Sequence, residues 1–98
     1  MTLDGDGYPF DEDLDKIKAW PPADLRGLVA FARERWAYPE YWTETEADGG
    51  IEIRASTGGW SGNESVIGAL RGNTMFWLIC WQESRRGGGY TFLVPAPP

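Results

Sequence analysis

The sequence predicts an α+β fold in which two N-terminal helices precede the order strand, strand, helix, strand, strand. Apolar residues recur at spacings of three and four over residues 25–36, which is typical of an amphipathic helix. Two later segments are built around glycine-rich turns, which indicates hairpins. The length of 98 residues suits a single domain spanning 1–98. We therefore expect a four-stranded, mainly antiparallel sheet with the helices on one face.

The net charge of −6 lies entirely near the N-terminus, because residues 1–15 contain six acids and no base. Residues 1–10 are also rich in glycine, and we expect them to form a flexible acidic arm. Their alternating aspartates are similar to the start of an EF-hand loop. However, Tyr8 stands where that loop needs an oxygen ligand, and Pro9 where it needs glycine. A short helix is predicted from Asp11 to Trp20, since acidic side chains stabilise the first turn of a helix.

A second helix is predicted to begin at Pro21 and Pro22, because proline suits the first turn of a helix. Pro39 ends it. The apolar stripe of this helix consists of Leu25, Leu28, Val29, Ala32 and Trp36.

The next segment predicts a hairpin, with strands on either side of a turn at residues 48–50. Its first strand covers residues 41–47. In its second strand, Ile51, Ile53 and Ala55 share one face, and Glu52 and Arg54 lie on the other. A third helix then runs to about Arg71, where Gly72 and Asn73 end it.

The most apolar segment is "TMFWLICWQES", residues 74–84, which we expect to be a central strand covered on both faces. Another chain, the arm or a ligand would cover the second face, which favours a homodimer. Residues 90–95 return from the turn "SRRGGG", so Trp81 would pair with Phe92, and Ile79 with Val94. Residues 96–98 form a tail. The two apolar faces of this strand consist of Met75, Trp77, Ile79 and Trp81, and of Phe76, Leu78 and Cys80.

The stretch "STGGWSGNE", Ser56 to Glu64, has two interpretations. It is a strand-to-helix corner if Ser61 and Glu64 form a capping box. It is an anion or nucleotide site if its backbone amides and hydroxyls face a phosphate, with cations supplied by the second glycine-rich turn. It has neither the lysine of a Walker loop nor the spacing of a dinucleotide fingerprint. The candidate ligand-binding residues are Ser56, Thr57, Gly58, Gly59, Trp60, Ser61, Asn63, Arg85, Arg86 and Trp81.

Composition narrows the classes of function. The chain has no histidine, and its one cysteine, Cys80, lies in an apolar run typical of a buried thiol. We therefore predict no catalytic residues, no metal and no cofactor, and favour a non-enzymatic protein over an enzyme whose chemistry would fall to acids and arginines, with Glu64 as the acid inside the glycine-rich loop. No long apolar segment or basic stripe is present, so we expect neither a membrane nor a nucleic acid as partner, and a cytoplasmic location.

The set "STGGWSGNE", "FWLICWQ" and "SRRGGGYTF" resembles a pattern in small phage and prophage proteins, over roughly Glu40 to Pro95. The resemblance implies an accessory protein in the host cytoplasm that counteracts host defence. On this basis, the leading hypothesis is a non-enzymatic protein that holds a phosphate-bearing small molecule, such as a nucleotide signal, at its glycine-rich loops. The alternative is an inhibitor of a host protein, or an assembly factor, that uses an exposed aromatic face and the acidic arm.

Overall fold

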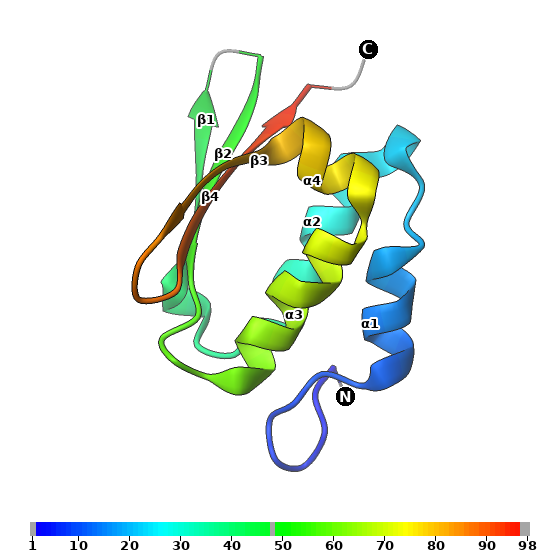
Figure 1. Ribbon diagram of the computed structural model, residues 1–98, viewed down its shortest axis with the longest axis vertical. Helices are drawn as coiled ribbons and strands as arrows, with labels where there is room; N and C mark the ends of the chain where they lie inside the picture. The colour runs from blue at the N-terminus through cyan, green and yellow to red at the C-terminus, as the bar shows by residue number, and fades with distance from the viewer. Residues whose placement is uncertain (1, 48, 97–98) are drawn as a thin grey trace.

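The computed structural model describes residues 2–47 and 49–96, which form one antiparallel sheet with the helices on one face (Figure 1). The sheet order is β1-β2-β4-β3, and all three strand pairs are antiparallel, so the predicted α+β fold is confirmed. The helices are α1 (Asp11–Lys18), α2 (Leu25–Glu34), α3 (Ser61–Gly72) and α4 (Thr74–Cys80), with 3-10 turns η1 (Pro22–Asp24) and η2 (Pro39–Tyr41). The strands are β1 (Trp42–Ala47), β2 (Gly50–Ser56), β3 (Trp81–Arg85) and β4 (Gly89–Pro95). Position 48 of the predicted turn and positions 97–98 of the predicted tail lie outside the described residues.

The first helix forms where the sequence predicts it, but the second begins at Leu25, after the 3-10 turn at Pro22–Asp24, and ends at Glu34, before Pro39. Three acids open α1, and Ile17 on its inner face is fully buried. The Asp24 carboxylate caps α2 by accepting a hydrogen bond from the Gly27 amide at 3.0 Å. All five residues of the predicted apolar stripe around α2 are buried. Neither helix, nor any other in the described part of the chain, is long and apolar enough to cross a membrane.

The core lies between the helices and the inner face of the sheet. Ile53 pairs with Phe92 across β2 and β4, and both are fully buried. Trp42 at the start of β1 packs edge-on against Trp36 at 5.1 Å between ring centroids. The predicted pairing of Trp81 with Phe92 is confirmed. Large aromatic side chains therefore fill much of the core, which allows a chain as short as this one to exclude water from it.

The predicted strand over residues 74–84 is wrong in its first part, because α4 occupies Thr74–Cys80 and only the remainder is β3. The predicted pairing of Ile79 with Val94 is wrong for the same reason. Asn73 caps the N-terminus of this helix, since its Oδ1 accepts a hydrogen bond from the Phe76 amide at 3.1 Å. An all-apolar run shows no period, so the cap at Asn73 and not the hydrophobic pattern decides between helix and strand.

Asn73 also ties three helices together. Its Nδ2 donates to the carbonyl oxygens of Ile17 and Trp20, at 2.9 and 3.0 Å. It stands between the end of α3 and the start of α4 and is 5 % exposed. One side chain thus satisfies carbonyls at the end of α1 and an amide in the first turn of α4.

The outer face of the sheet is largely polar, contrary to the expected second apolar face. Arg54 pairs there with Glu52 at 3.0 Å, and Arg85 donates to Thr91 Oγ1. The apolar residues assigned to that face belong to α4. The case for a homodimer that rested on a doubly covered strand therefore loses its basis.

Cys80 lies on the inner side of α4 and is fully buried, as predicted. Burial raises the pKa of its thiol from the ordinary 9.0 to about 11, because the thiolate would lose its hydration. At neutral pH the side chain is therefore a small apolar group of the core.

Candidate functional site

The two glycine-rich turns meet at one end of the sheet. The Thr57 amide donates to the Gly88 carbonyl at 3.0 Å, and Ser56 lies opposite Gly89 in the pairing of β2 with β4. A Cβ atom on Gly88 would overlap the Thr57 hydroxyl, so this approach requires glycine. The segments "STGGW" and "RRGGG", about 30 residues apart in the sequence, are thus neighbours in space.

Hydrogen bonds within the first turn use several of its candidate ligand groups. Ser56 Oγ accepts from the Gly58 amide, and Thr57 Oγ1 accepts from the Gly59 amide, both at 3.3 Å. Gly58 and Gly59 have φ angles of 62° and 77°, as a tight exit from the strand requires. Thr57 itself is 1 % exposed. The hydroxyls of Ser56 and Thr57 are thus both engaged by backbone amides of the turn itself.

Asn63 lies inside the molecule, on the inner side of α3. Its Oδ1 accepts from the Ala37 amide at 2.8 Å, and its Nδ2 donates to the Ala37 carbonyl at 2.9 Å. A longer bond of 3.4 Å reaches the Thr57 carbonyl. Because the side chain is fully buried and its amide is paired on both sides, Asn63 fixes the segment after α2 against α3.

The predicted capping box is wrong. Trp60 is the N-cap residue of α3, no side chain caps this helix, and the Glu64 amide donates to the Trp60 carbonyl. Ser61 Oγ instead lies 3.0 Å from the Tyr8 hydroxyl. The Tyr8 ring packs on Trp60, with the ring centroids 4.9 Å apart, and this contact places the Tyr8 hydroxyl next to Ser61.

The N-terminal segment, predicted to be a flexible arm, folds in the structure as a loop against the start of α3 (Figure 1). Asp4 Oδ1 accepts from the amides of Asp6 and Tyr8, and a bridge joins Leu3 to Pro9. This loop partly covers the Trp60 indole, whose Nε1 is buried without a hydrogen-bond partner among the described residues. A base could stack on that face of Trp60 only after Tyr8 moved.

The two candidate arginines differ. Arg85 donates to Glu83 at 2.9 Å and to Thr91, on the outer face of the sheet. Arg86 is exposed, and within residues 2–47 and 49–96 it forms no ion pair. Arg86 is therefore the cation that is available at the junction of the glycine-rich turns.

Trp81 lies away from that junction, because it begins β3 whereas the glycine-rich turn follows the end of that strand. Its ring stacks on Trp77 at 5.8 Å, and its Nε1 donates to Ser84 Oγ at 2.9 Å. The structure thus brings the first nine ligand candidates near one end of the sheet and leaves Trp81 with α4.

The outer side of α4 is a candidate surface that the sequence does not reveal. Leu78 is 76 % exposed. Met75, Ile79 and Trp81, the first residue of β3, are 40–46 % exposed. The excess of large apolar residues in a run too short for a membrane segment is the available signal, but a buried strand explains it equally well. We call this set the α4 surface, and its members are Met75, Leu78, Ile79 and Trp81.

No family model, curated protein or solved structure matches this chain. Within the described ranges, no cluster of three or more His, Cys, Asp or Glu side chains has the geometry of a metal site. The chemistry of the two regions described above is thus the basis for assigning a function.

Proposed function

We propose that this protein is a non-enzymatic binding module that contacts another protein through the α4 surface. The observation that carries the proposal is the exposure of four large apolar side chains on one short segment, Leu78 above all at 76 %. Single exposed apolar residues are ordinary, but four large ones within residues 75–81 of a small protein indicate an interaction site.

The composition of the α4 surface suits a protein interface. Methionine and tryptophan are enriched at the centres of interfaces, and burial of one large apolar side chain contributes about 1.5–3 kcal/mol. Trp81 is held in place by Trp77 and Ser84 before any partner arrives. Binding therefore costs little side-chain entropy at this residue, which favours affinity.

The acidic N-terminal segment belongs to a different part of the molecule. It lies against the start of α3, at the opposite end of the long axis from α4 (Figure 1). A compact partner of the α4 surface would not touch Asp4 or Asp6. The contact surface proposed for the partner therefore consists of apolar side chains without the acidic segment.

Photo-crosslinking tests this proposal. A benzophenone amino acid at position 78 should give a discrete crosslinked protein in cells that carry this gene, while the same group at position 38 should not. Tyr38 is a matched control because it is exposed to 54 % but lies in another region. A crosslink to a second copy would identify the partner as the protein itself. No crosslink from position 78, or equal crosslinks from both positions, would contradict the proposal.

A second candidate function is binding of a phosphate-bearing small molecule at the junction of the glycine-rich turns. The observation that favours it is the contact of the two turns, which brings the exposed Arg86 beside glycine backbone that a phosphate can approach closely. Tyr41 adds an exposed aromatic ring, since it packs next to Gly58. If the resemblance to phage proteins holds, nucleotide signals of host defence are the first ligands to test.

A panel of mono-, di- and cyclic nucleotides tests this second candidate by thermal shift and tryptophan fluorescence. Binding should raise the melting temperature and be lost in Arg86→Gln. The control is Arg54→Gln, which removes an exposed arginine from the outer face of the sheet. A panel without any shift, or equal loss in both variants, would exclude this site.

A further inference from the structure

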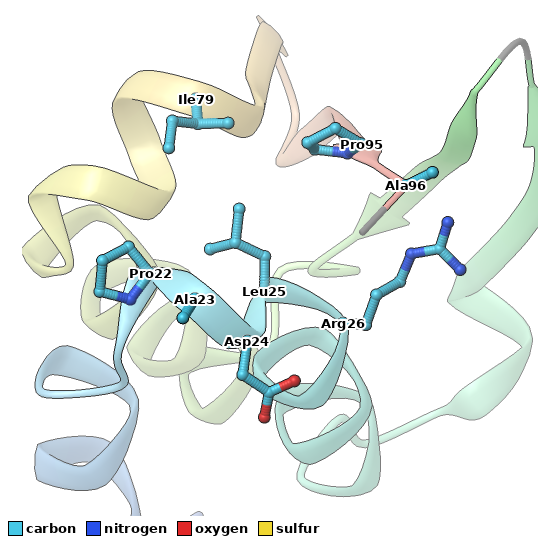
Figure 2. Close-up of a pocket in the computed structure, with 8 residues that line it drawn as sticks. All are labelled: Pro22, Ala23, Asp24, Leu25, Arg26, Ile79, Pro95 and Ala96. Carbon is cyan, nitrogen blue, oxygen red and sulfur yellow. The ribbon is translucent and has the colours of Figure 1, made fainter. Parts of the chain in front are cut away.

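A hollow of about 300 Å³ lies beside the α4 surface, between the start of α2, the end of α4 and the end of β4 (Figure 2). Its walls are mostly apolar, and Leu25 points into it from α2. Two prolines form rigid parts of the rim, so its shape needs little ordering when a ligand binds. The lining residues are Pro22, Ala23, Asp24, Leu25, Arg26, Ile79, Pro95 and Ala96.

Arg26 is the unusual member of this lining. Its Nε is buried without a hydrogen-bond partner, and within the described ranges its guanidinium forms no ion pair. Arg33, Arg35 and Arg54 each pair with a carboxylate of this chain. A partly buried guanidinium without a counter-charge is costly, and a carboxylate from outside would satisfy it through two parallel hydrogen bonds.

The other charged residue of the lining does not take this role. The Asp24 carboxylate accepts hydrogen bonds from the Gly27 amide at 3.0 Å and from the Trp20 indole at 3.4 Å. In Figure 2 it points away from the space between Leu25 and Ile79. Arg26 is therefore the charge that a ligand in the hollow would meet.

We propose that the hollow binds the C-terminal residue of a polypeptide, with its apolar side chain against Leu25 and Ile79 and its carboxylate on Arg26. In Figure 2 Leu25 points toward Ile79, whereas the Arg26 guanidinium lies on the Ala96 side of the hollow, so a ligand that reaches both must carry an apolar group and a carboxylate on adjoining parts of one molecule. A C-terminal residue carries both on one carbon atom. The volume is at the lower end for ligand pockets, which suits one terminal residue and part of the preceding one.

The C-terminal site rests on the proposed function in one respect. Ile79 belongs both to the α4 surface and to the hollow, so a partner protein on α4 can place its C-terminus here. The hollow would then fix where the C-terminus of that partner lies relative to α4.

Peptide titration followed by amide NMR tests the hollow by itself. The probe is acetyl-Gly-Ser-Gly-Leu with a free carboxylate, compared with the same peptide as its C-terminal amide and with one ending in serine. At millimolar concentration the free carboxylate peptide should shift the amides of Ala23–Arg26, Ile79 and Ala96. Its affinity should exceed that of the amide by about tenfold, as expected for a hydrogen-bonded ion pair.

Two variants complete the test. Arg26→Gln should abolish the preference for the free carboxylate, whereas Arg54→Gln, which removes an exposed arginine from the outer face of the sheet, should leave it unchanged. Equal binding of acid and amide, equal binding of the leucine and serine peptides, no shifts in the hollow, or equal effects of both variants would overturn the inference.

The peptide result is separable from the crosslinking result. Crosslinks from position 78 without peptide binding would retain the α4 surface and reject the hollow. Peptide binding without crosslinks would reject the α4 surface as a site for folded partners and retain the hollow.

Discussion

At the end of the molecule that holds the glycine-rich turns, polar groups are largely paired within the chain. Both the Oδ1 and the Nδ2 of Asn63 form hydrogen bonds, and Thr57 Oγ1 accepts a hydrogen bond from the Gly59 amide. At the opposite end, Leu78 is exposed and the Arg26 Nε has no partner among residues 2–47 and 49–96. Apart from the exposed Arg86, the glycine-rich end thus satisfies its polar groups within its own fold, whereas the α4 end presents exposed apolar side chains and an arginine Nε without a partner among the described residues.

The largest effect expected from removing a polar group tests whether the hydrogen bonds at the glycine-rich end are all made within the chain. Asn63→Ala should lower the free energy of unfolding by about 3–4 kcal/mol, because the Ala37 amide and carbonyl would lose their partner. Urea unfolding followed by circular dichroism measures this. Ser61→Ala on the exposed side of α3 is the control and should cost less than half as much. A stable Asn63→Ala protein would indicate that this side chain is held for a ligand instead.

A somewhat smaller effect tests the contact between the two turns. Gly88→Ala should cost about 2–3 kcal/mol, since φ is +93° and the new Cβ would overlap Thr57. Gly87 has nearly the same φ, +91°, but a Cβ added there would meet no described atom within 4 Å, so Gly87→Ala measures the strain alone. The difference in urea midpoint between the two variants reports the contact. Equal midpoints would mean that the turns do not meet in solution.

The third prediction concerns the inner side of α4. The folded thiol of Cys80 has a pKa of about 11 against 9.0 for the ordinary group, so the unfolded chain releases its proton first as the pH rises. The associated stability is complete below pH 9 and is lost toward pH 11, by about 2 kcal/mol. Unfolding of the wild type should therefore weaken more between pH 8 and pH 11 than unfolding of Cys80→Ala. Parallel curves would refute the raised pKa.

The smallest expected effect on stability belongs to the outer side of the same helix. Leu78→Ser should change the free energy of unfolding by less than about 0.5 kcal/mol, because the side chain is already in water. The matched change Phe76→Ser, on the inner side of α4, should unfold the protein at room temperature or nearly so. A large loss of stability in Leu78→Ser would show that the α4 surface is covered by the chain itself.

Much of the fold could be predicted from the sequence because its local signals agree. The spacing of Leu25, Leu28 and Ala32 indicated α2, and the alternating segments on either side of a glycine-rich turn indicated the first hairpin, although Gly50 belongs to β2 and not to the turn. The conformation of residues Thr74 to Cys80 could not be predicted in this way, because a nearly all-apolar run fits the periodicity of a helix and that of a strand equally well. Its conformation depends on Asn73, whose bonds to Ile17 and Trp20 are tertiary and invisible in the local pattern.

The candidate site was predicted only in part, for a related reason. Proximity of the glycine-rich turns follows from the pairing of β2 with β4, which the sequence left open. The role of Ser61 depended on Tyr8, 53 residues away, and a tyrosine hydroxyl in an acidic segment gives no sign of its partner. Arg26 lies off the apolar stripe of α2 in the sequence, and its missing counter-charge becomes evident only in three dimensions.

The irregular pairing of β3 has a consequence for solubility. This strand is exposed along its whole length and forms one edge of the sheet, right after an apolar helix, which is the arrangement that invites strand addition and aggregation. The register shifts between Trp81 and Glu83, and a bulge of this kind interrupts the row of backbone groups that another strand would need. Charged side chains at Glu83 and Arg85 add to this protection. The protein can therefore keep an apolar surface open to partners while its sheet edge resists polymerisation.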